Sequence, residues 1–209
     1  LRNVQALAKD AINSSIRRIL QDGQEWPFIK TTYTQTLTQG VTTYSFPADY
    51  SSSDWDTFYI KQLSSQGNTP AVLQPMPYEE YTQSHRSTDD TAPATGLGAP
   101  TKVFQTYGTS FGVTPVPDAA YEVEYIYWST PASLNLFDDV SVIPERFSHV
   151  VIDGAMMYMM QFRSNNQSAQ MHQADFETGI QAMRNVLMDD TFQMRSTYVV
   201  KSRQRSGMA

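Results

Sequence analysis

The chain has 209 residues, a length that suits one domain or one domain with a sizeable insertion. It contains no cysteine, which excludes disulfides, thiolate metal sites and cysteine nucleophiles and is compatible with assembly in a cytoplasm. The formal net charge is −6, and it is unevenly distributed. All 21 acidic residues and 11 of the 15 basic residues precede Phe192, so this body carries −10 and the remaining tail +4.

The charge distribution predicts different partners for the body and the tail. An acidic body repels nucleic acid, so sequence-specific DNA recognition is not expected of it. The basic tail can bind phosphate or an acidic protein surface. The apolar run at residues 155–160 is far shorter than the roughly 20 residues that cross a bilayer, and we expect a soluble protein with no membrane partner.

The first 21 residues are predicted to form an amphipathic helix. Its apolar residues recur at spacings of three and four: Val4, Leu7, Ala8, Ala11, Ile12, Ile16, Ile19 and Leu20. Asp10, Asn13, Arg17 and Arg18 are expected largely on the opposite face. Asp22-Gly23 follows as a helix stop, and Trp26-Pro27-Phe28 is expected to begin an extended segment.

Residues 31–130 have the composition of β structure. Residues 31–37 and 41–46, joined by a turn at Gln39-Gly40, predict a hairpin. Further strands are expected at 57–63, 102–107, 110–113 and 121–128. The last of these strands alternates between two sets of residues: Tyr121, Val123, Tyr125 and Tyr127 on one face, and Glu122, Glu124, Ile126 and Trp128 on the other. This alternation predicts an antiparallel sheet with one covered face.

Two short segments interrupt the β pattern. Residues 77–84 are expected to form one or two helical turns. Residues 88–100 are rich in Asp, Thr, Ala, Gly and Pro and predict an exposed loop. Within it, Gly96-x-Gly98 lacks the following helix that a phosphate-binding loop requires, so we interpret it as a turn.

The helical period returns after residues 137–139, with Pro144 suited to the first turn. The expected stripe of this helix is Phe147, Val150, Val151, Gly154, Met157, Tyr158 and Gln161. A second helix after Asn165-Asn166 carries Ala169, Phe176, Ile180, Met183 and Leu187. The short connection predicts antiparallel neighbours. Methionines at 156, 157, 159 and 160 surround one helix and predict its burial on more than one face, by neighbouring subunits or by a thick core.

These elements predict an α+β fold. A helical bundle formed by the N-terminal and C-terminal helices carries an inserted antiparallel β domain and ends in an extended C-terminal tail. The expected boundaries are 1–30 with 141–192 for the bundle, 31–140 for the β insertion and 193–209 for the C-terminal extension.

Side chains that carry chemistry are scattered along the chain. His85, His149 and His172 form no pair at metal-ligand spacing on one helix, so no metal site is predicted. Ser148-His149 and Asp153 offer the residue types of a catalytic triad without a nucleophile elbow, and we expect no catalytic role for them. No cofactor motif is found, and the chain is predicted to be a structural protein and not an enzyme.

Two rival functions remain open. The acidic doublets include Glu79-Glu80 and Asp138-Asp139, and a peptidoglycan hydrolase would use carboxylates such as Glu79, Glu80 or Asp138. The aromatic residues concentrated in the β segment would suit a receptor-binding tail module, although packing explains them as well.

Three segments in order along the chain resemble a known family. The first is the amphipathic helix that leads to Glu25-Trp26-Pro27-Phe28 and a Thr-rich strand. The second is Ile143-Pro144-Glu145-Arg146-Phe147 at the start of a helix. The third is Tyr158 to Arg163 followed by Phe176-Glu177-Thr178-Gly179-Ile180. Together they are similar to the head-to-tail connector adaptors of tailed bacteriophages, the group that includes podovirus tail accessory factors and tail tubular protein A.

This resemblance implies a role in the virion. Such adaptors form dodecameric rings beneath the portal protein, extend the DNA channel through which the genome is ejected, and present a platform for the next tail or nozzle protein. We therefore expect assembly in the host cytoplasm, a place in the phage neck, and DNA that passes without sequence-specific binding. The resemblance also implies that the C-terminal extension docks on the portal, through Arg195, Tyr198, Val199, Val200, Lys201, Arg203 and Arg205.

Overall fold

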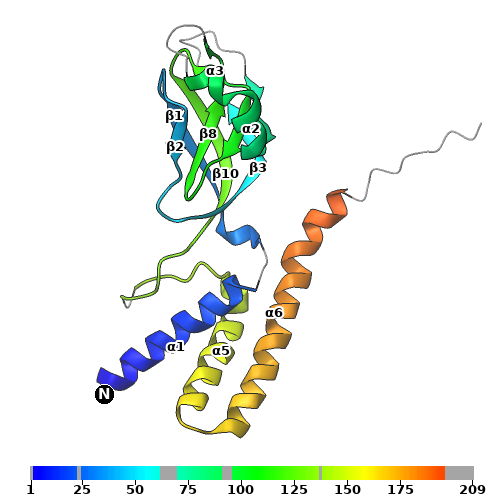
Figure 1. The fold of residues 1–209 in the computed structure, drawn as a ribbon. Helices are drawn as coiled ribbons and strands as arrows, with labels where there is room; N and C mark the ends of the chain where they lie inside the picture. The colour runs from blue at the N-terminus through cyan, green and yellow to red at the C-terminus, as the bar shows by residue number, and fades with distance from the viewer. Residues whose placement is uncertain (1, 23–24, 62–69, 91–95, 137, 196–209) are drawn as a thin grey trace, which may run out of the picture. The chain divides into compact units, whose positions relative to one another are not determined.

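The computed structural model describes residues 2–22, 25–61, 70–90, 96–136 and 138–195 (Figure 1). The chain divides into two compact units. The helical unit consists of Leu1–Phe28 together with Ala132–Ala209, and the β unit consists of Ile29–Pro131. Helices and antiparallel sheets are both present, so the predicted α+β class is confirmed.

The β unit contains two four-stranded sheets (Figure 1). The first has the order β1-β10-β3-β4 and is antiparallel throughout. Its strands are β1 (Lys30–Leu37), β3 (Tyr50–Ile60), β4 (Ala71–Val72) and β10 (Tyr121–Ser129). The second has the order β2-β8-β7-β5, in which β5 and β7 are parallel. Its strands are β2 (Thr43–Ser45), β5 (Gln74–Met76), β7 (Lys102–Gln105) and β8 (Ser110–Thr114).

Smaller elements complete the β unit. Helices α2 (Tyr78–Ser84) and α3 (Arg86–Asp90) follow β5, and β6 (Leu97–Gly98) pairs in parallel with β9 (Val116–Pro117). The helical turns predicted at 77–84 are therefore confirmed. The loop predicted at 88–100 is wrong at both ends, because its first residues continue α3 and Leu97-Gly98 form a strand.

The core of the β unit lies between the two sheets and is largely aromatic. Alternate residues of β10 are buried, as the sequence pattern predicts: Tyr121, Val123, Tyr125 and Tyr127. The ring of Tyr125 stacks on Phe58 of β3 with centroids 4.7 Å apart and lies 5.5 Å from Phe111 of β8. Since β8 belongs to the second sheet, this cluster joins the two sheets. Burial raises the pKa of Tyr125 above its ordinary value, which keeps the phenol neutral in this core.

The predicted hairpin at residues 31–46 is wrong, although both of its strands exist. β1 pairs with β10 over its whole length, from Lys30 opposite Trp128 to Leu37 opposite Tyr121, and β2 pairs with β8. The turn between them is present, with Gly40 at φ +77°, a conformation that suits glycine. The two strands separate into different sheets because each finds a longer partner from the distant part of the chain.

The chain enters and leaves the β unit at neighbouring points. Lys30, at the start of β1, is opposite Trp128 near the end of β10. The Ser129 hydroxyl donates a hydrogen bond of 3.2 Å to the carbonyl oxygen of Ile29, and the Lys30 ammonium lies 5.2 Å from the centroid of the Trp128 ring. The two connecting strands are thus fixed to each other at the base of the unit.

The segment that follows the first helix is not extended as predicted. Pro27–Ile29 form a short 3-10 helix, η1, and the fixed φ of proline is compatible with that conformation. Trp26 is fully buried, and its indole Nε1 donates a 3.0 Å hydrogen bond to the carbonyl oxygen of Ile19. This bond satisfies one of the free carbonyl groups at the end of the first helix.

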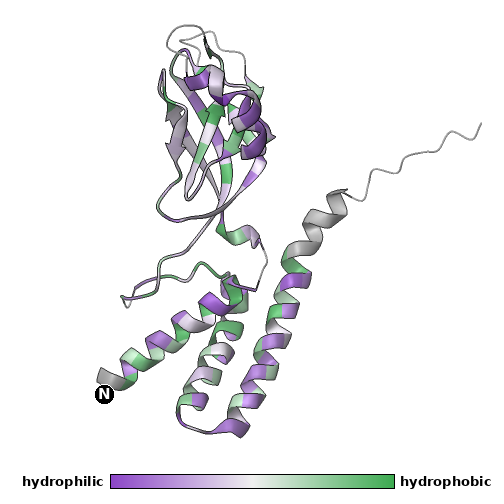
Figure 2. Cartoon of the chain, in the orientation of Figure 1, coloured by the Kyte–Doolittle hydropathy of each residue, from purple (hydrophilic) through white to green (hydrophobic). Residues whose placement is uncertain are grey.

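The helical unit is built around one central helix. Its elements are α1 (Arg2–Leu20), η2 (Glu145–Phe147), α5 (Ser148–Phe162) and α6 (Asn166–Arg195). Helix α5 packs against both α1 and α6, and α5 and α6 lie side by side and antiparallel (Figure 1), which confirms the predicted helix pair. None of the described helices is long and apolar enough to cross a membrane. Figure 2 shows that hydrophobic and hydrophilic residues both recur along the coloured part of α6, which is compatible with one apolar face.

Two glycines allow α5 and α6 to approach closely. A Cβ atom at Gly154 would lie 2.6 Å from Cε2 of Phe176 on α6 and 2.2 Å from Oγ of Ser15 on α1. A Cβ atom at Gly179 would lie 2.7 Å from Cγ2 of Val150. Gly154 therefore marks the point where all three helices meet.

Asn13 is buried on α1, contrary to the predicted solvent face. Its side-chain amide donates to the carbonyl oxygen of Leu134 at 3.0 Å and accepts from the Leu134 amide at 2.9 Å. A polar residue on α1 thus anchors the loop that precedes α5.

The same loop is also held by Asp139. Its carboxylate accepts hydrogen bonds from the backbone amides of Leu136 and Asn135, and these bonds hold the pKa of Asp139 below its usual value.

Candidate functional site

The predicted portal-docking residues lie outside the described part of the chain. Helix α6 ends at Arg195, whose side chain is also outside the description. The others are Tyr198, Val199, Val200, Lys201, Arg203 and Arg205. Their role stays a prediction from the resemblance and from the positive charge of the tail.

The helical unit carries an apolar groove of about 410 Å³, which we call the helical groove. Its residues come from α1, from the loop before α5 and from α5 itself: Ala8, Ile12, Ile16, Leu134, Ser141, Ile143, Ser148, Val151, Ile152, Ala155, Met156 and Met159. Ile152 is 59% exposed at its edge. An exposed apolar surface of this kind is typical of a protein interface.

The methionines of α5 contribute to this surface. Met157 is buried in the helical unit, whereas Met156 and Met159 are half-buried and line the groove. The prediction that α5 is buried on more than one face is therefore only partly confirmed within a single chain. Methionine side chains adapt easily to the shape of a partner, which suits an interface.

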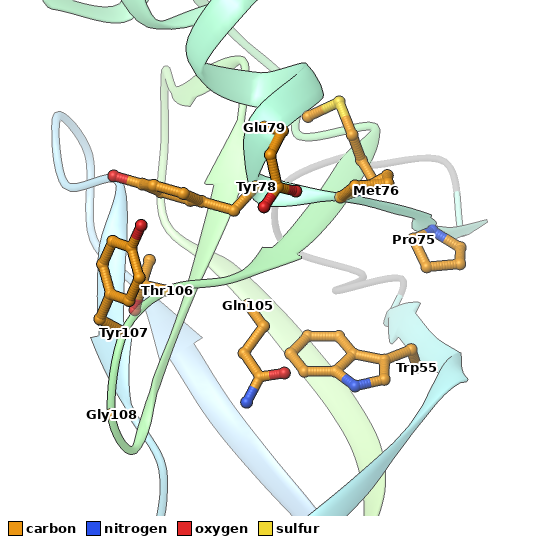
Figure 3. Close-up of a pocket in the computed structure, with 10 residues that line it drawn as sticks. Trp55, Pro75, Met76, Tyr78, Glu79, Gln105, Thr106, Tyr107 and Gly108 are labelled. Atoms are coloured by element: carbon orange, nitrogen blue, oxygen red, sulfur yellow. The ribbon is translucent and has the colours of Figure 1, made fainter.

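A second concave surface lies on the β unit, and we call it the aromatic groove (Figure 3). Its volume is about 610 Å³, and Trp55 of β3, Tyr78 of α2 and Tyr107 of the turn after β7 supply its rings. Tyr78 and Tyr107 meet edge to face at 5.2 Å, and Tyr107 is 86% exposed. Gln105 and Glu79 add polar groups to the same surface (Figure 3). Trp55 and Tyr78 are half-buried, whereas the exposed ring of Tyr107 is available to a partner.

The carboxylates considered for a hydrolase are divided between the two units. Glu79 lines the aromatic groove, whereas Glu80 lies 3.8 Å from the ammonium of Lys102. Asp138 is exposed in the loop before α5 and belongs to the helical unit. Burial, with a smaller contribution from Asp89, raises the pKa of neighbouring Tyr81 to about 12, so this phenol stays protonated near neutral pH. No single unit brings the three carboxylates together.

The match to a known family covers nearly the whole chain. Residues 2–202 match the SU10 adaptor protein family. The chain belongs to this family. The match includes α1, the whole β unit and the α5–α6 pair, and it identifies a structural adaptor protein of a bacteriophage. A search of curated proteins finds no significant match.

The adaptor also brings together residues that the sequence pattern left apart. Asp153 on α5 does not pair with its sequence neighbour His149. Its Oδ1 lies 3.4 Å from Nδ1 of His172 on α6, and Asp175 lies beside them. Histidine spacing within a single helix gives no sign of this cluster, because its residues come from two helices. His85 lies elsewhere, in the β unit, with Nε2 3.3 Å from Nζ of Lys102.

Proposed function

We propose that this protein forms a ring between the portal and the tail of a phage. The observation that carries the proposal is the match of residues 2–202 to an adaptor family. In this role the ring extends the DNA channel in the virion neck and presents a platform to the next tail protein. The acidic body lets DNA pass without specific binding, because like charges repel.

The helical groove supports self-association as the basis of the ring. A ring needs two different complementary surfaces on each subunit, because every copy contacts one neighbour with each. The groove between α1 and α5 supplies an apolar concave surface. Met171 and Val186 on α6 are 66% and 50% exposed and supply apolar side chains outside that groove. We propose that the groove of one copy receives α6 of the next.

A charge placed in the helical groove will disrupt the ring. In the variant Ile152→Glu, the new carboxylate would be buried unpaired at the interface, and we expect self-association on the portal to weaken by roughly tenfold or more. The variant should fold normally, since Ile152 is 59% exposed in one chain. Native mass spectrometry and electron microscopy of the adaptor with its portal measure the change.

The matched control is Val72→Glu. Val72 is 60% exposed on β4 and lies outside the groove, so this variant should assemble like the parent. Rings formed equally well by Ile152→Glu and by the parent would contradict the proposed interface. A parent chain that stays monomeric even on its portal would contradict the ring itself.

The C-terminal extension is proposed to dock on the portal. A chain that ends at Phe192 should bind the cognate portal much more weakly, because a ring repeats each tail contact in every subunit and losing all of them removes a multivalent attachment. A full-length variant in which Arg195, Lys201, Arg203 and Arg205 become Gln keeps the length and removes the charge. Pull-down on purified portal compares the three proteins, and equal binding by the shortened chain would refute this docking role.

A further inference from the structure

Three potential metal ligands meet on the surface of the α5–α6 pair. Asp153 projects from α5, and His172 and Asp175 come from α6. His172 and Asp175 are three residues apart, which places them on the same face of that helix. One ligand atom from each of the three residues lies within 4.8 Å of the other two.

The helix packing fixes the backbone beneath this cluster. Gly154 follows Asp153 and Phe176 follows Asp175, and a Cβ atom at Gly154 would lie only 2.6 Å from Cε2 of Phe176. The residues next to the ligands are therefore in tight contact across the helix pair. Ligands carried by two packed helices are held more accurately than ligands on loops.

The distance between the first two ligands suits a metal ion. Nδ1 of His172 and Oδ1 of Asp153 are 3.4 Å apart. In a tetrahedral site with metal–ligand bonds of about 2.1 Å, two ligand atoms are also about 3.4 Å apart. The ligand atoms of the cluster lie up to 4.8 Å apart, and the exposed side chain of Asp175 can rotate to bring its carboxylate nearer to the other two.

The chemistry of the cluster selects a class of ion. One imidazole nitrogen and two carboxylates give a charge of −2, which neutralises a divalent cation. Imidazole favours zinc and other first-row transition metals, whereas magnesium and calcium prefer oxygen ligands alone. Three protein ligands leave the remaining positions to water.

We propose that Asp153, His172 and Asp175 bind a divalent transition-metal ion that joins α5 to α6. The ion contacts one side chain from α5 and two from α6, so it stabilises the packed helix pair against its separation. A simple hydrogen bond between His172 and Asp153 would give the same distance but no saturable metal binding.

Titration calorimetry of the full-length chain with zinc chloride tests the site. We expect saturable binding of one ion per chain. His172→Gln and Asp175→Asn should each weaken binding by roughly tenfold or more, because each removes a ligand. Asp175 is exposed, so Asp175→Asn provides a variant whose folding is not in question. The matched control is His149→Gln, an exposed histidine of α5 outside the cluster, which should leave binding unchanged.

Two further measurements distinguish this site from adventitious binding. Cobalt should give visible absorption bands on binding, and His172→Gln should remove them. At zinc concentrations near 100 times the Kd of the parent, the unfolding temperature of the parent should rise by about 5–10 °C, and that of Asp175→Asn, whose binding is about tenfold weaker, by about half as much. Absence of saturable binding would overturn the proposal, as would binding that depends on His149 or His85 instead. Calcium or magnesium binding as tight as zinc would overturn the assignment to transition metals.

Discussion

Replacing Phe58 with alanine will destabilise the β unit by about 3–5 kcal/mol, the cost typical of removing a buried aromatic ring. Phe58 is completely buried on β3, and its ring stacks against Trp55 at 5.3 Å and Tyr125 at 4.7 Å. It also meets Phe111 of the second sheet at 5.3 Å. Its removal leaves a cavity at the point where the two sheets contact each other.

The neighbouring residue on β3 provides the control. Tyr59 points to the other face of the strand and is 36% exposed, so Tyr59→Ala should cost far less. Hydrogen–deuterium exchange of the full chain reports the two units separately, and Phe58→Ala should increase exchange in the β strands while α5 and α6 remain protected. Equal effects of the two substitutions would show that Phe58 does not have this central role.

Gly154→Ala will destabilise the helical unit by about 1–3 kcal/mol, the usual cost of overpacking a core. The direction is informative, because the same change at an exposed helical site stabilises by roughly 0.5–1 kcal/mol. The added methyl group would lie 2.6 Å from the Phe176 ring and 2.2 Å from Ser15 Oγ. The hydroxyl of Ser15 already donates to the carbonyl oxygen of Val151, so its displacement also costs a hydrogen bond.

A double-mutant cycle identifies the steric cause of this effect. In the background of Phe176→Ala, which removes the opposing ring, Gly154→Ala should be markedly less harmful than in the parent. Ala174→Gly, at an exposed position of α6, measures the intrinsic helix preference alone. Urea unfolding followed by the helical circular dichroism signal gives the free energies. If Gly154→Ala proves neutral or stabilising, the close approach of the three helices is wrong.

The helices could be predicted because the signal that defines them, the spacing of apolar residues, lies entirely within each helical segment. In α5 and α6, Val150, Phe176 and Met183 were predicted to lie on the apolar face and are buried. Strand β10 was also recognisable, since its alternation appears directly in its sequence, whereas β3 spans Tyr50–Ile60 and not the predicted 57–63. The predicted resemblance to phage adaptors depends on several such segments in order, and the match over residues 2–202 confirms that the chain belongs to a phage adaptor family.

What the sequence did not reveal depends on contacts between distant residues. The ladder of β1 with β10 joins positions about 90 residues apart. The turn between β1 and β2 suggests a hairpin and does not reveal this distant pairing. Asn13 is a polar residue of a type usually found on the surface, and its burial is made possible by its hydrogen bonds to Leu134. Asp153 and His172 are on different helices, so no spacing rule within one helix relates them. The helical groove could not be predicted from the sequence either, because its lining residues come from three separate segments that only the fold brings together.

The paired ends of the β unit have a consequence for how such adaptors can diversify. Because the chain enters through β1 and leaves through β10 beside it, the whole unit is attached to the helical unit by two adjacent strand ends. An insertion with adjacent ends can be lengthened, exchanged or shortened without pulling apart the residues on either side of it. The helical unit can thus keep its own packing while successive β units change the surface that the adaptor presents to the rest of the particle.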